Sequence, residues 1–252
     1  MNQFKKPVLS IITVVFNAQK LILKTIESVW EQTYPHIEYI IIDGASTDGT
    51  LSLLNHHVDR FSILRSEPDK GIYDAMNKGL SLAIGDYILF LNAGDELSGP
   101  TIVEAIFDTK QEADLYYGDV ILIESDGTIK GARRHKPPLQ LNWKSFRMGM
   151  MVSHQAFIPA RHITDPFRTD LKISADIDWC ISCMKKAHTI SNTNLIISKY
   201  LIGGLSRQRT LLAWRERFQV MKKHYGPIPT SFYHVWILLR FVGYYLTSGK
   251  LD

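Results

Sequence analysis

Three short apolar runs, at residues 8–15, 37–42 and 87–91, each end abruptly in a polar turn. Apolar runs of this length, bounded by glycine and polar turns, are typical of buried strands. The apolar positions from Ile22 to Trp30, and those over residues 73–83, instead recur at helical spacing. Strands that alternate with helices predict an α/β fold with a mostly parallel central sheet flanked by helices.

The turns after these strands carry the first candidate binding groups. Asn17, Asp43 and the pair Asn92 and Asp95 follow the three runs in that order. Right-handed crossovers bring the carboxyl ends of parallel strands to one edge of the sheet, where open α/β sheets bind ligands. The pattern therefore predicts a nucleotide site, although neither GxGxxG nor GxxxxGK[ST] occurs. Asn17 is also expected to cap the helix that follows it.

The order and spacing of four motifs resemble family 2 glycosyltransferases of the GT-A (Rossmann-like) fold. The motifs are S-I-I-T-V-V-F-N at 10–17, D-G-A-S-T-D-G-T at 43–50, E-P-D-K-G-I-Y-D-A-M-N-K-G at 67–79 and L-N-A-G-D at 91–95. The last two resemble, more narrowly, bacterial enzymes that build colanic-acid-type and O-antigen surface polysaccharides. The resemblance returns at residues 154–155, 174–179 and 200–206.

This resemblance implies an inverting hexosyltransferase of surface polysaccharide synthesis (O-antigen, capsule or exopolysaccharide). The donor would be a nucleoside diphosphate sugar, with UDP as the expected nucleotide and GDP as the alternative. The acceptor would be a hydroxyl of a lipid-linked saccharide. Residues 1–205 would form the GT-A domain, and residues 206–252 a basic and apolar helical tail. The sequence leaves the donor sugar and the linkage open.

The resemblance also implies which residues contact the donor. Thr13, Phe16, Asn17 and Asp43 would form the nucleotide site, although Asp43 could instead only shape the turn before Gly44. Backbone at a glycine before a helix can approach a ligand closely, and the helix end favours negative charge. The other expected donor-binding residues are Asp69, Lys70, Gly71, Asn77, Asn92, Asp95 and Arg207.

Residues 92–95 occupy the position of the family's D-x-D turn, whose carboxylates hold Mg²⁺ or Mn²⁺ against the diphosphate. The chain departs from that pattern, because Asn92 and Gly94 stand where the family has acidic residues. The resemblance implies that Asp95 still binds Mg²⁺ or Mn²⁺, with the nucleotide phosphates supplying further oxygens. The alternative is a strand-ending turn in which Asp95 caps the next helix.

Asp176 takes the place of the family's catalytic base, and Ala175 stands where the family has glutamate. Displacement of a nucleotide from an anomeric carbon with inversion needs one base on the acceptor hydroxyl. Asp178 is the alternative base. Both acids could instead cap the helix that runs on through Trp179.

His154 and Gln155 are expected on the active-site side, in contact with donor phosphate or acceptor, and a structural role is the alternative for His154. Trp179 would stack on an acceptor sugar or pack in the core. The glycines of residues 200–206 fit a mobile lid near the diphosphate. Arg207 could then pair with phosphate.

Composition and charge narrow the classes further. The 252 residues carry 29 Lys and Arg against 25 Asp and Glu, an excess too small to indicate nucleic-acid binding. Cys180 and Cys183 have no further zinc ligands at suitable spacing and are expected to be packed, reduced thiols. Lys5 and Lys6 precede an apolar run that lacks a small-residue cleavage site, so we expect the chain in the cytoplasm.

Basic residues become more frequent after residue 200, and residues 232–246 are apolar on nearly every side. This run is shorter than the ~20 residues that span a bilayer as a helix. Its aromatic residues suit the headgroup boundary. We therefore expect the tail to dock peripherally on the inner face of the cytoplasmic membrane, with a buried helix or a homodimer contact as the alternative.

Two other functions share parts of this pattern. A sugar nucleotidyltransferase would have the same strand-end layout, but it needs a Gly- and Lys/Arg-rich triphosphate loop, which residues 16–19 do not provide. A non-catalytic nucleotide-sugar-binding subunit would account for the altered metal turn. The joint presence of Asp43, Asp95 and Asp176 argues against that subunit.

Overall fold

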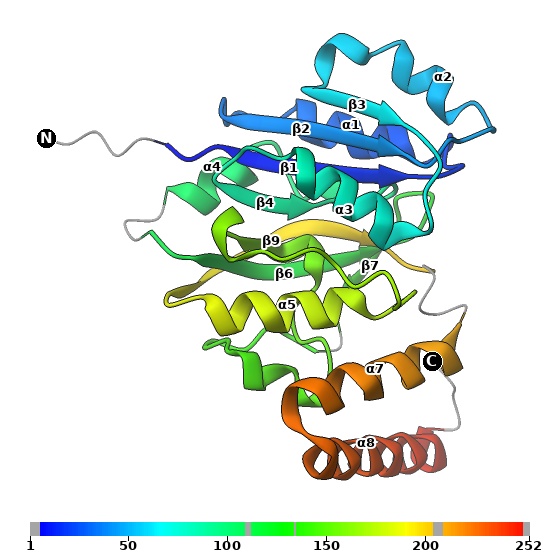
Figure 1. Cartoon of the computed structure of the whole chain (residues 1–252), viewed down its shortest axis with the longest axis vertical. Helices are drawn as coiled ribbons and strands as arrows, with labels where there is room; N and C mark the ends of the chain where they lie inside the picture. The colour runs from blue at the N-terminus through cyan, green and yellow to red at the C-terminus, as the bar shows by residue number, and fades with distance from the viewer. Residues whose placement is uncertain (1–5, 109–111, 134, 204–208, 249–252) are drawn as a thin grey trace, which may run out of the picture.

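The first hundred residues build a parallel sheet. The computed structural model describes residues 6–108, 112–133, 135–203 and 209–248. The strands of this sheet are β1 (Leu9–Val15), β2 (Ile37–Asp43), β3 (Ile63–Ser66) and β4 (Tyr87–Phe90). They lie in the order β3-β2-β1-β4, and every neighbouring pair is parallel (Figure 1). The predicted α/β fold, with strand ends meeting at one edge, is confirmed.

A second, mixed sheet follows it in space. Its strands are β5 (Glu96–Leu97), β6 (Leu115–Ile123), β7 (Ile129–Ala132), β8 (Phe157–Pro159) and β9 (Ile190–Leu201). The order is β5-β9-β6-β7 with β8 also on β6, and only the β6–β9 pair of these is parallel. A bridge between Tyr87 and Ala160 joins the two sheets.

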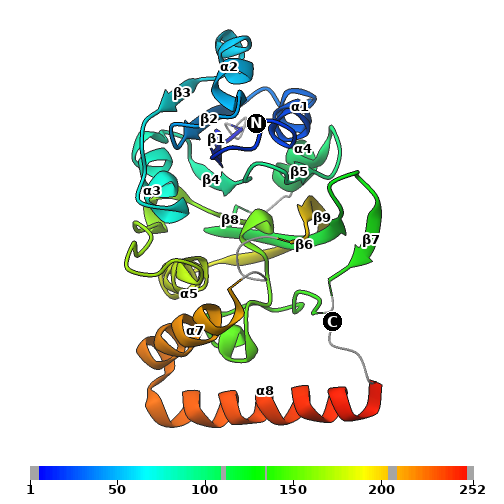
Figure 2. The ribbon, with the colours of Figure 1, turned by 90° about the vertical axis from the view of Figure 1, so that its right-hand side faces the viewer.

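Helices cover both faces of the sheets (Figure 2). They are α1 (Ile22–Trp30), α2 (Thr50–Asn55), α3 (Ile72–Leu82), α4 (Ile102–Phe107), α5 (Ala175–Lys186), α7 (Thr210–Tyr225) and α8 (Pro227–Ser248), with 3₁₀ turns at Val58–Arg60, Trp143–Met148, His154–Ala156 and Arg161–Ile163. Side chains alternate along a strand, so Ile12 of β1 packs in the cluster with α3 and α5. Its neighbour Ile11 packs in the cluster with α1 and α4.

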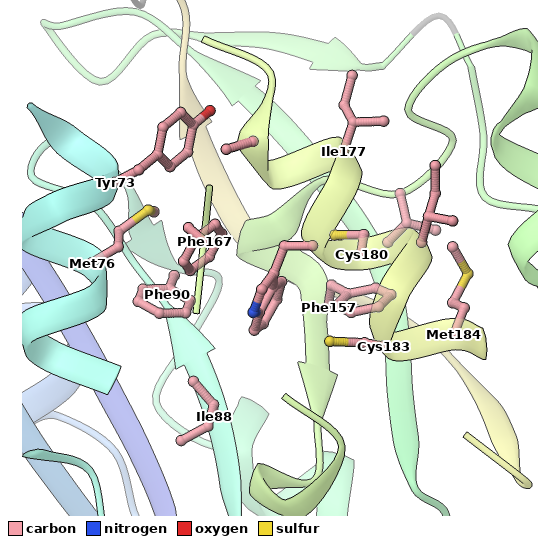
Figure 3. Packing of buried hydrophobic residues seen from close by; sticks show 14 of the residues in the cluster. Tyr73, Met76, Ile88, Phe90, Phe157, Phe167, Ile177, Cys180, Cys183 and Met184 are labelled. Carbon is pink, nitrogen blue, oxygen red and sulfur yellow. The ribbon is translucent and has the colours of Figure 1, made fainter. Parts of the chain in front are cut away.

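The cluster between α3 and α5 is rich in aromatic side chains (Figure 3). Trp179 of α5 stacks on Phe167 with ring centroids 4.8 Å apart, and Phe90 of β4 meets the Trp179 ring edge-on. Cys180 and Cys183 lie in the same cluster as buried free thiols, and burial raises the pKa of both. This packing fixes α5, and with it Asp176, against the parallel sheet.

Asn17 does not cap a helix, which corrects the prediction. Helix α1 begins at Ile22, and its N-cap residue is Leu21, which makes no side-chain capping bond. Asn17 has a φ of 49°, and its side-chain oxygen instead accepts a hydrogen bond from the backbone N of Thr47. Asn17 therefore ties the turn after β1 to the turn after β2.

The last two helices stack one after the other on the body of the molecule (Figure 2). Glu216, Val220 and Met221 of α7 are buried, and α8 packs on α7. The division of the chain near residue 205 stays a prediction, since α7 contributes to the same core cluster as α5. Within the described residues, no helix is long and apolar enough to cross a membrane.

Candidate active site

The ends of β1 and β2 bring together three of the residues expected at the nucleotide. Phe16 is 62% exposed just after β1. A side chain at Gly44 would collide with Asp69 and touch Phe16, so Phe16 and Asp69 both lie next to this glycine. Asp43, buried beneath them, accepts hydrogen bonds from Ser46 N (3.0 Å) and Ser66 Oγ (2.6 Å) through Oδ2.

The other carboxylate oxygen of Asp43, Oδ1, is buried and has no hydrogen-bond partner among the described residues. A buried acceptor without a donor is costly. A ligand N–H or O–H would remove that cost, which agrees with the expected nucleotide contact of Asp43.

Thr13 and Asn77 act inside the protein, which corrects their expected contact with the donor. Thr13 is fully buried, and its hydroxyl donates to Leu91 O at 2.7 Å. The Asn77 side chain bonds both backbone groups of Phe167, accepting from its N and donating to its O. Asn77 thus anchors the chain around residue 167 to α3.

The loop before α3 is braced by two acidic side chains. Asp69 accepts from Gly71 N, and Asp74 accepts from Lys70 N. Gly71 has a φ of 122°, a conformation that favours glycine, and beyond the local backbone no atom of the described residues lies within 4 Å of the position that a Cβ would take there. The loop therefore offers open backbone at the start of α3.

A cavity of about 360 Å³ lies at the end of β4, and we call it the strand-end cavity. It is lined by Tyr73, Asn92, Asp95, His154, Asp176 and Tyr200, among others. These residues come from α3, the turn after β4, a 3₁₀ turn, α5 and β9. The structure therefore brings together the predicted metal turn, the predicted base and His154.

Asp95 is held firmly in this cavity. It is 5% exposed, and its two oxygens accept from Leu201 N (2.9 Å) and Gln155 Nε2 (2.8 Å). Burial raises the pKa of Asp95 to about 6, against the lowering effect of these two donors. Gln155, itself buried, thus supports Asp95 rather than facing a ligand directly.

The departures from the D-x-D pattern have a structural reason. Gly94 has a φ of 99°, and a side chain there would collide with Leu201. Asn92 donates from Nδ2 to His154 Nε2 at 3.2 Å when the imidazole carries its proton on Nδ1. Gly94 therefore has no room for a carboxylate, and Asn92 uses its Nδ2 on His154 while its Oδ1 stays unpaired within the described residues.

The residues present fit a divalent ion that arrives with its phosphates. No group of three or more His, Cys, Asp or Glu side chains converges in the part of the chain that the structure describes. Asp95 offers one carboxylate, and Asn92 Oδ1 is a buried oxygen without a partner there. Both are oxygen ligands of the kind that Mg²⁺ and Mn²⁺ prefer.

Asp176 is positioned through both of its oxygens. Oδ1 accepts from Ile177 N at 2.9 Å and lies 3.4 Å from Tyr73 Oη, while Oδ2 lies 3.3 Å from His154 Nδ1. With Nδ1 protonated, His154 donates to Asp176 and accepts from Asn92. The three side chains thus form one chain of hydrogen bonds across the strand-end cavity.

Asp178 points elsewhere and cannot serve as the alternative base at this cavity. It is buried against α7, where His224 Nε2 lies 2.8 Å and Lys223 Nζ 3.0 Å from its oxygens. Burial raises the pKa of Asp178, but the hydrogen bonds from His224 and Lys223 outweigh it and hold the pKa below its ordinary value. Asp178 fastens α5 to α7.

Two further expectations can be placed. Trp179 is 2% exposed and donates from Nε1 to Asp165 O, so it packs in the core and does not stack on a sugar. Arg207 lies outside the described residues, as do the residues around it from 204 to 208.

Sequence reasoning missed the residue that holds the approach to Asp176. Glu216 of α7 is buried and accepts from the backbone N of Lys172 (2.7 Å), Ile173 (2.8 Å) and Ser174 (3.0 Å). The same loop is held from α3, because Tyr73 Oη donates to Ile173 O. Glu216 is an acid among basic neighbours in the sequence, and no periodic pattern marks it.

The fold is that of the GT-A glycosyltransferases, as comparison with solved structures shows. S. aureus TarS 1–349 in complex with UDP-GlcNAc matches 96% of this chain and 74% of its own, with a TM-score of 0.69 and 17% identity. The mannosyltransferase PcManGT of Pyrobaculum calidifontis, in complex with GDP-Man and Mn²⁺, matches 98% of this chain and 77% of its own (TM-score 0.63, 16% identity).

Sequence comparison identifies the family. Residues 10–169 match the model of glycosyl transferase family 2. A PGL/p-HBAD biosynthesis glycosyltransferase of Mycobacterium tuberculosis is 30% identical over 211 residues, 79% of each chain. TuaG of Bacillus subtilis, named for teichuronic acid biosynthesis, is 27% identical over 200 residues, 77% of this chain and 79% of its own. The chain belongs to glycosyltransferase family 2 and is a glycosyltransferase, which replaces the nucleotidyltransferase and the non-catalytic alternatives.

Proposed function

We propose that this enzyme moves a hexose from a UDP-linked donor to a hydroxyl of a lipid-linked saccharide, in the synthesis of a bacterial surface glycan. The observation that carries the proposal is Asp176, a carboxylate held by His154 and the backbone N of Ile177 at the cavity where β4 ends. The UDP-GlcNAc complex of TarS supports a UDP-linked donor. The names of the mycobacterial and Bacillus relatives support a role in surface glycan synthesis.

In this proposal Asp176 is the base of a single displacement. It takes the proton of the acceptor hydroxyl while that oxygen forms a bond to the anomeric carbon on the face opposite the leaving group. The bond from the anomeric carbon to the diphosphate oxygen breaks, and its electron pair leaves with the nucleotide. His154, donating to Oδ2, keeps the other lone pairs of Asp176 directed at the acceptor, and configuration inverts.

The leaving diphosphate would be met at the end of β4. Asp95, with Asn92 Oδ1, would hold Mg²⁺ or Mn²⁺, which neutralises the growing charge on the leaving group. Excess EDTA should therefore suppress transfer, and Mn²⁺ or Mg²⁺ should restore it. Asp95→Ala should weaken UDP binding about 10-fold or more when metal is present and change it little without metal, as calorimetric titration would show. Full activity in excess EDTA would show that transfer does not need a divalent metal ion.

The exposed apolar face of helix α8 supports the proposal that the acceptor is linked to a lipid. Its outward side chains Ile228, Phe232, Val235, Trp236 and Leu239 are each between 50% and 82% exposed. Their spacing places all five within one third of the helix circumference. Thr230 is buried, and His234 meets Phe218 and Trp214 of α7, on the opposite side of α8. The outward apolar face thus has no partner within the described residues.

An anionic bilayer surface is the occupant that fits this face. An isolated patch of aromatic and aliphatic side chains suits the headgroup boundary. Residues 210–248 carry five Lys or Arg and one Glu, and Arg215 and Lys222 are exposed on α7. Positive charge beside such a patch favours anionic lipid. The proposal therefore places the protein peripherally on the inner face of the cytoplasmic membrane.

Two measurements test the proposed function. Hydrolysis of a panel of UDP- and GDP-linked hexoses without acceptor should reveal the donor, and a protein that hydrolyses none of them would contradict the proposal. Full-length protein should sediment with vesicles containing phosphatidylglycerol. Replacing Phe232, Val235 and Trp236 by serine should abolish sedimentation and leave donor hydrolysis intact. If these changes instead convert a dimer into a monomer, the face is a contact between copies.

A further inference from the structure

A second cavity, also of about 360 Å³, lies on the other side of Asp176. It shares His154, Gln155, Ile173, Asp176 and Tyr200 with the strand-end cavity. The other residues that line it do not line the strand-end cavity, and two of them are arginines, so we call it the arginine cavity. Asp176 therefore lines two adjoining cavities.

The two arginines are Arg133, just after β7, and Arg217 of α7. Arg133 donates from Nη2 to Met150 O at 2.9 Å, and Arg217 donates from Nη2 to Met148 O at 2.8 Å. Both guanidiniums are thus anchored to the same short segment. A side chain at Gly149, between those two carbonyls, would collide with Arg217, so the segment is shaped around the guanidinium.

Neither guanidinium forms a close ion pair within the described residues, although the more distant charges of Asp119 and Asp176 act on Arg133. No Asp or Glu there lies within ion-pair distance of Arg133 or Arg217, and Nη1 of Arg133 and Nε of Arg217 are buried without a partner. Burial lowers the pKa of both side chains. A partly buried cation without a close counter-charge is costly, and an anion bound beside it lowers that cost.

The position of the arginine cavity assigns it to the acceptor. Its walls include Leu122 of β6 and Arg217 of α7, whereas Asn92 and Asp95, in the turn after the parallel strand β4, line the strand-end cavity and not this one. Inversion requires that the acceptor approach from the side opposite the leaving group. Asp176 is the one acidic residue among those lining this cavity, all of which are described.

We propose that the arginine cavity is the acceptor subsite and that Arg133 and Arg217 bind an anionic group, a carboxylate or a phosphate, on the acceptor saccharide. The inference rests on the proposed function and adds the class of acceptor to it. Guanidinium groups suit both anions because their paired N–H donors match two oxygens. The acceptor would thus be either a uronic acid-containing saccharide or one carrying phosphate near its reacting hydroxyl.

The test compares acceptors that differ in one group. Transfer is measured to matched synthetic glycosides that are neutral, that carry a uronic carboxylate, or that carry a phosphate. One anionic series should be used at least 10-fold better in kcat/KM than the neutral one. Which series it is shows whether the natural acceptor carries a carboxylate or a phosphate. Arg133→Gln and Arg217→Gln should reduce that preference to within about threefold while leaving acceptor-free donor hydrolysis intact.

Arg147→Gln is the matched control. Arg147 also has a buried Nε without a partner among the described residues, but its guanidinium lies over the Tyr225 ring and does not line the cavity. Its substitution should keep the preference for the anionic acceptor. An equal loss of preference in this variant would mean that the effect is structural, and the proposal would be overturned.

A binding measurement on the unaltered protein covers the case in which the arginine variants do not fold. Glucuronate and inorganic phosphate are titrated by calorimetry with the donor site saturated by UDP. At least one should bind, since UDP leaves the arginine cavity free. Displacement of both anions by UDP, or equal use of neutral and anionic glycosides, would overturn the inference. Loss of donor hydrolysis itself would instead refute the proposed function.

Discussion

The two cavities that meet at Asp176 differ in the charge they offer. The strand-end cavity presents Asp95 and Lys172 beside the neutral Asn92, whereas the arginine cavity presents Arg133 and Arg217. In the proposed function, a diphosphate entering the strand-end cavity would lie beside the carboxylate of Asp95, and a divalent cation would bridge the two. An anionic acceptor entering the other cavity meets fixed positive charge. If both proposals hold, this difference would allow one base, Asp176, to stand between two anionic substrates.

The first prediction tests whether Asp176 is the base between the two cavities. Asp176→Asn removes the proton acceptor but keeps the shape of the side chain, so transfer should fall about 1,000-fold while the Kd for UDP stays within a few-fold. Asp178→Asn is the control on the same helix. It should lower the melting temperature, because it weakens the contact with α7, yet leave kcat within a few-fold of the parent. Similar kcat losses in both variants would contradict the assignment.

A second prediction concerns the fixed negative charge of the strand-end cavity. Because the pKa of Asp95 is raised to about 6 in the folded protein, its contribution to stability is fully present below about pH 4 and is lost as the pH rises through 6. Relative to Asp95→Asn, the free energy of unfolding of the parent should fall by about 2 kcal/mol between pH 4 and pH 7. Urea denaturation at a series of pH values measures it.

The outcome also bears on the metal. Mn²⁺ added with UDP at pH 7 should recover part of the stability of the parent and little of that of Asp95→Asn, because only the parent gains a counter-charge there. A difference between the two proteins that does not change with pH would show that Asp95 is already neutralised within the fold.

The two cavities also differ in how far the sequence predicts them. Asp43, Asn92 and Asp95 follow apolar runs directly, and parallel strands must end at one edge, so local patterns place them. Asp176 was located by its resemblance to the family, and its choice over Asp178 needed the structure. Both acids lie within one turn of α5, and packing against Lys223 and His224 decides which of them faces away.

The arginine cavity has no such pattern in the sequence. Arg133 and Arg217 are 84 residues apart and meet only because both donate to the segment around Met148 and Met150. The expected donor contacts of Thr13 and Asn77 were wrong for a related reason, and the sequence could not decide between a sugar contact and core packing for Trp179. Residue type and motif position placed them near the site, but the direction of each side chain depends on partners such as Leu91, Phe167 and Asp165. Long-range packing of that kind carries no periodic signal.

Glu216→Gln should have the smallest effect on activity. It is also the most direct test of whether the two cavities act as separate sites. Glu216 holds the loop at residues 172–174, and this loop lines both cavities, since Ile173 borders each of them. The carboxylate of Glu216 accepts hydrogen bonds from three backbone N–H groups. A glutamine amide would turn its own N–H group toward some of them and leave them without an acceptor, at a cost of about 2 kcal/mol in unfolding free energy. Donor hydrolysis and transfer should therefore fall together, by about threefold each, with acceptor preference unchanged. Arg217→Gln, one residue further along α7, should instead spare hydrolysis and lose the preference. Two neighbouring substitutions would then separate a residue that positions the shared wall from one that serves a single cavity, and identical kinetic profiles for the two would show that the cavities do not act as separate sites.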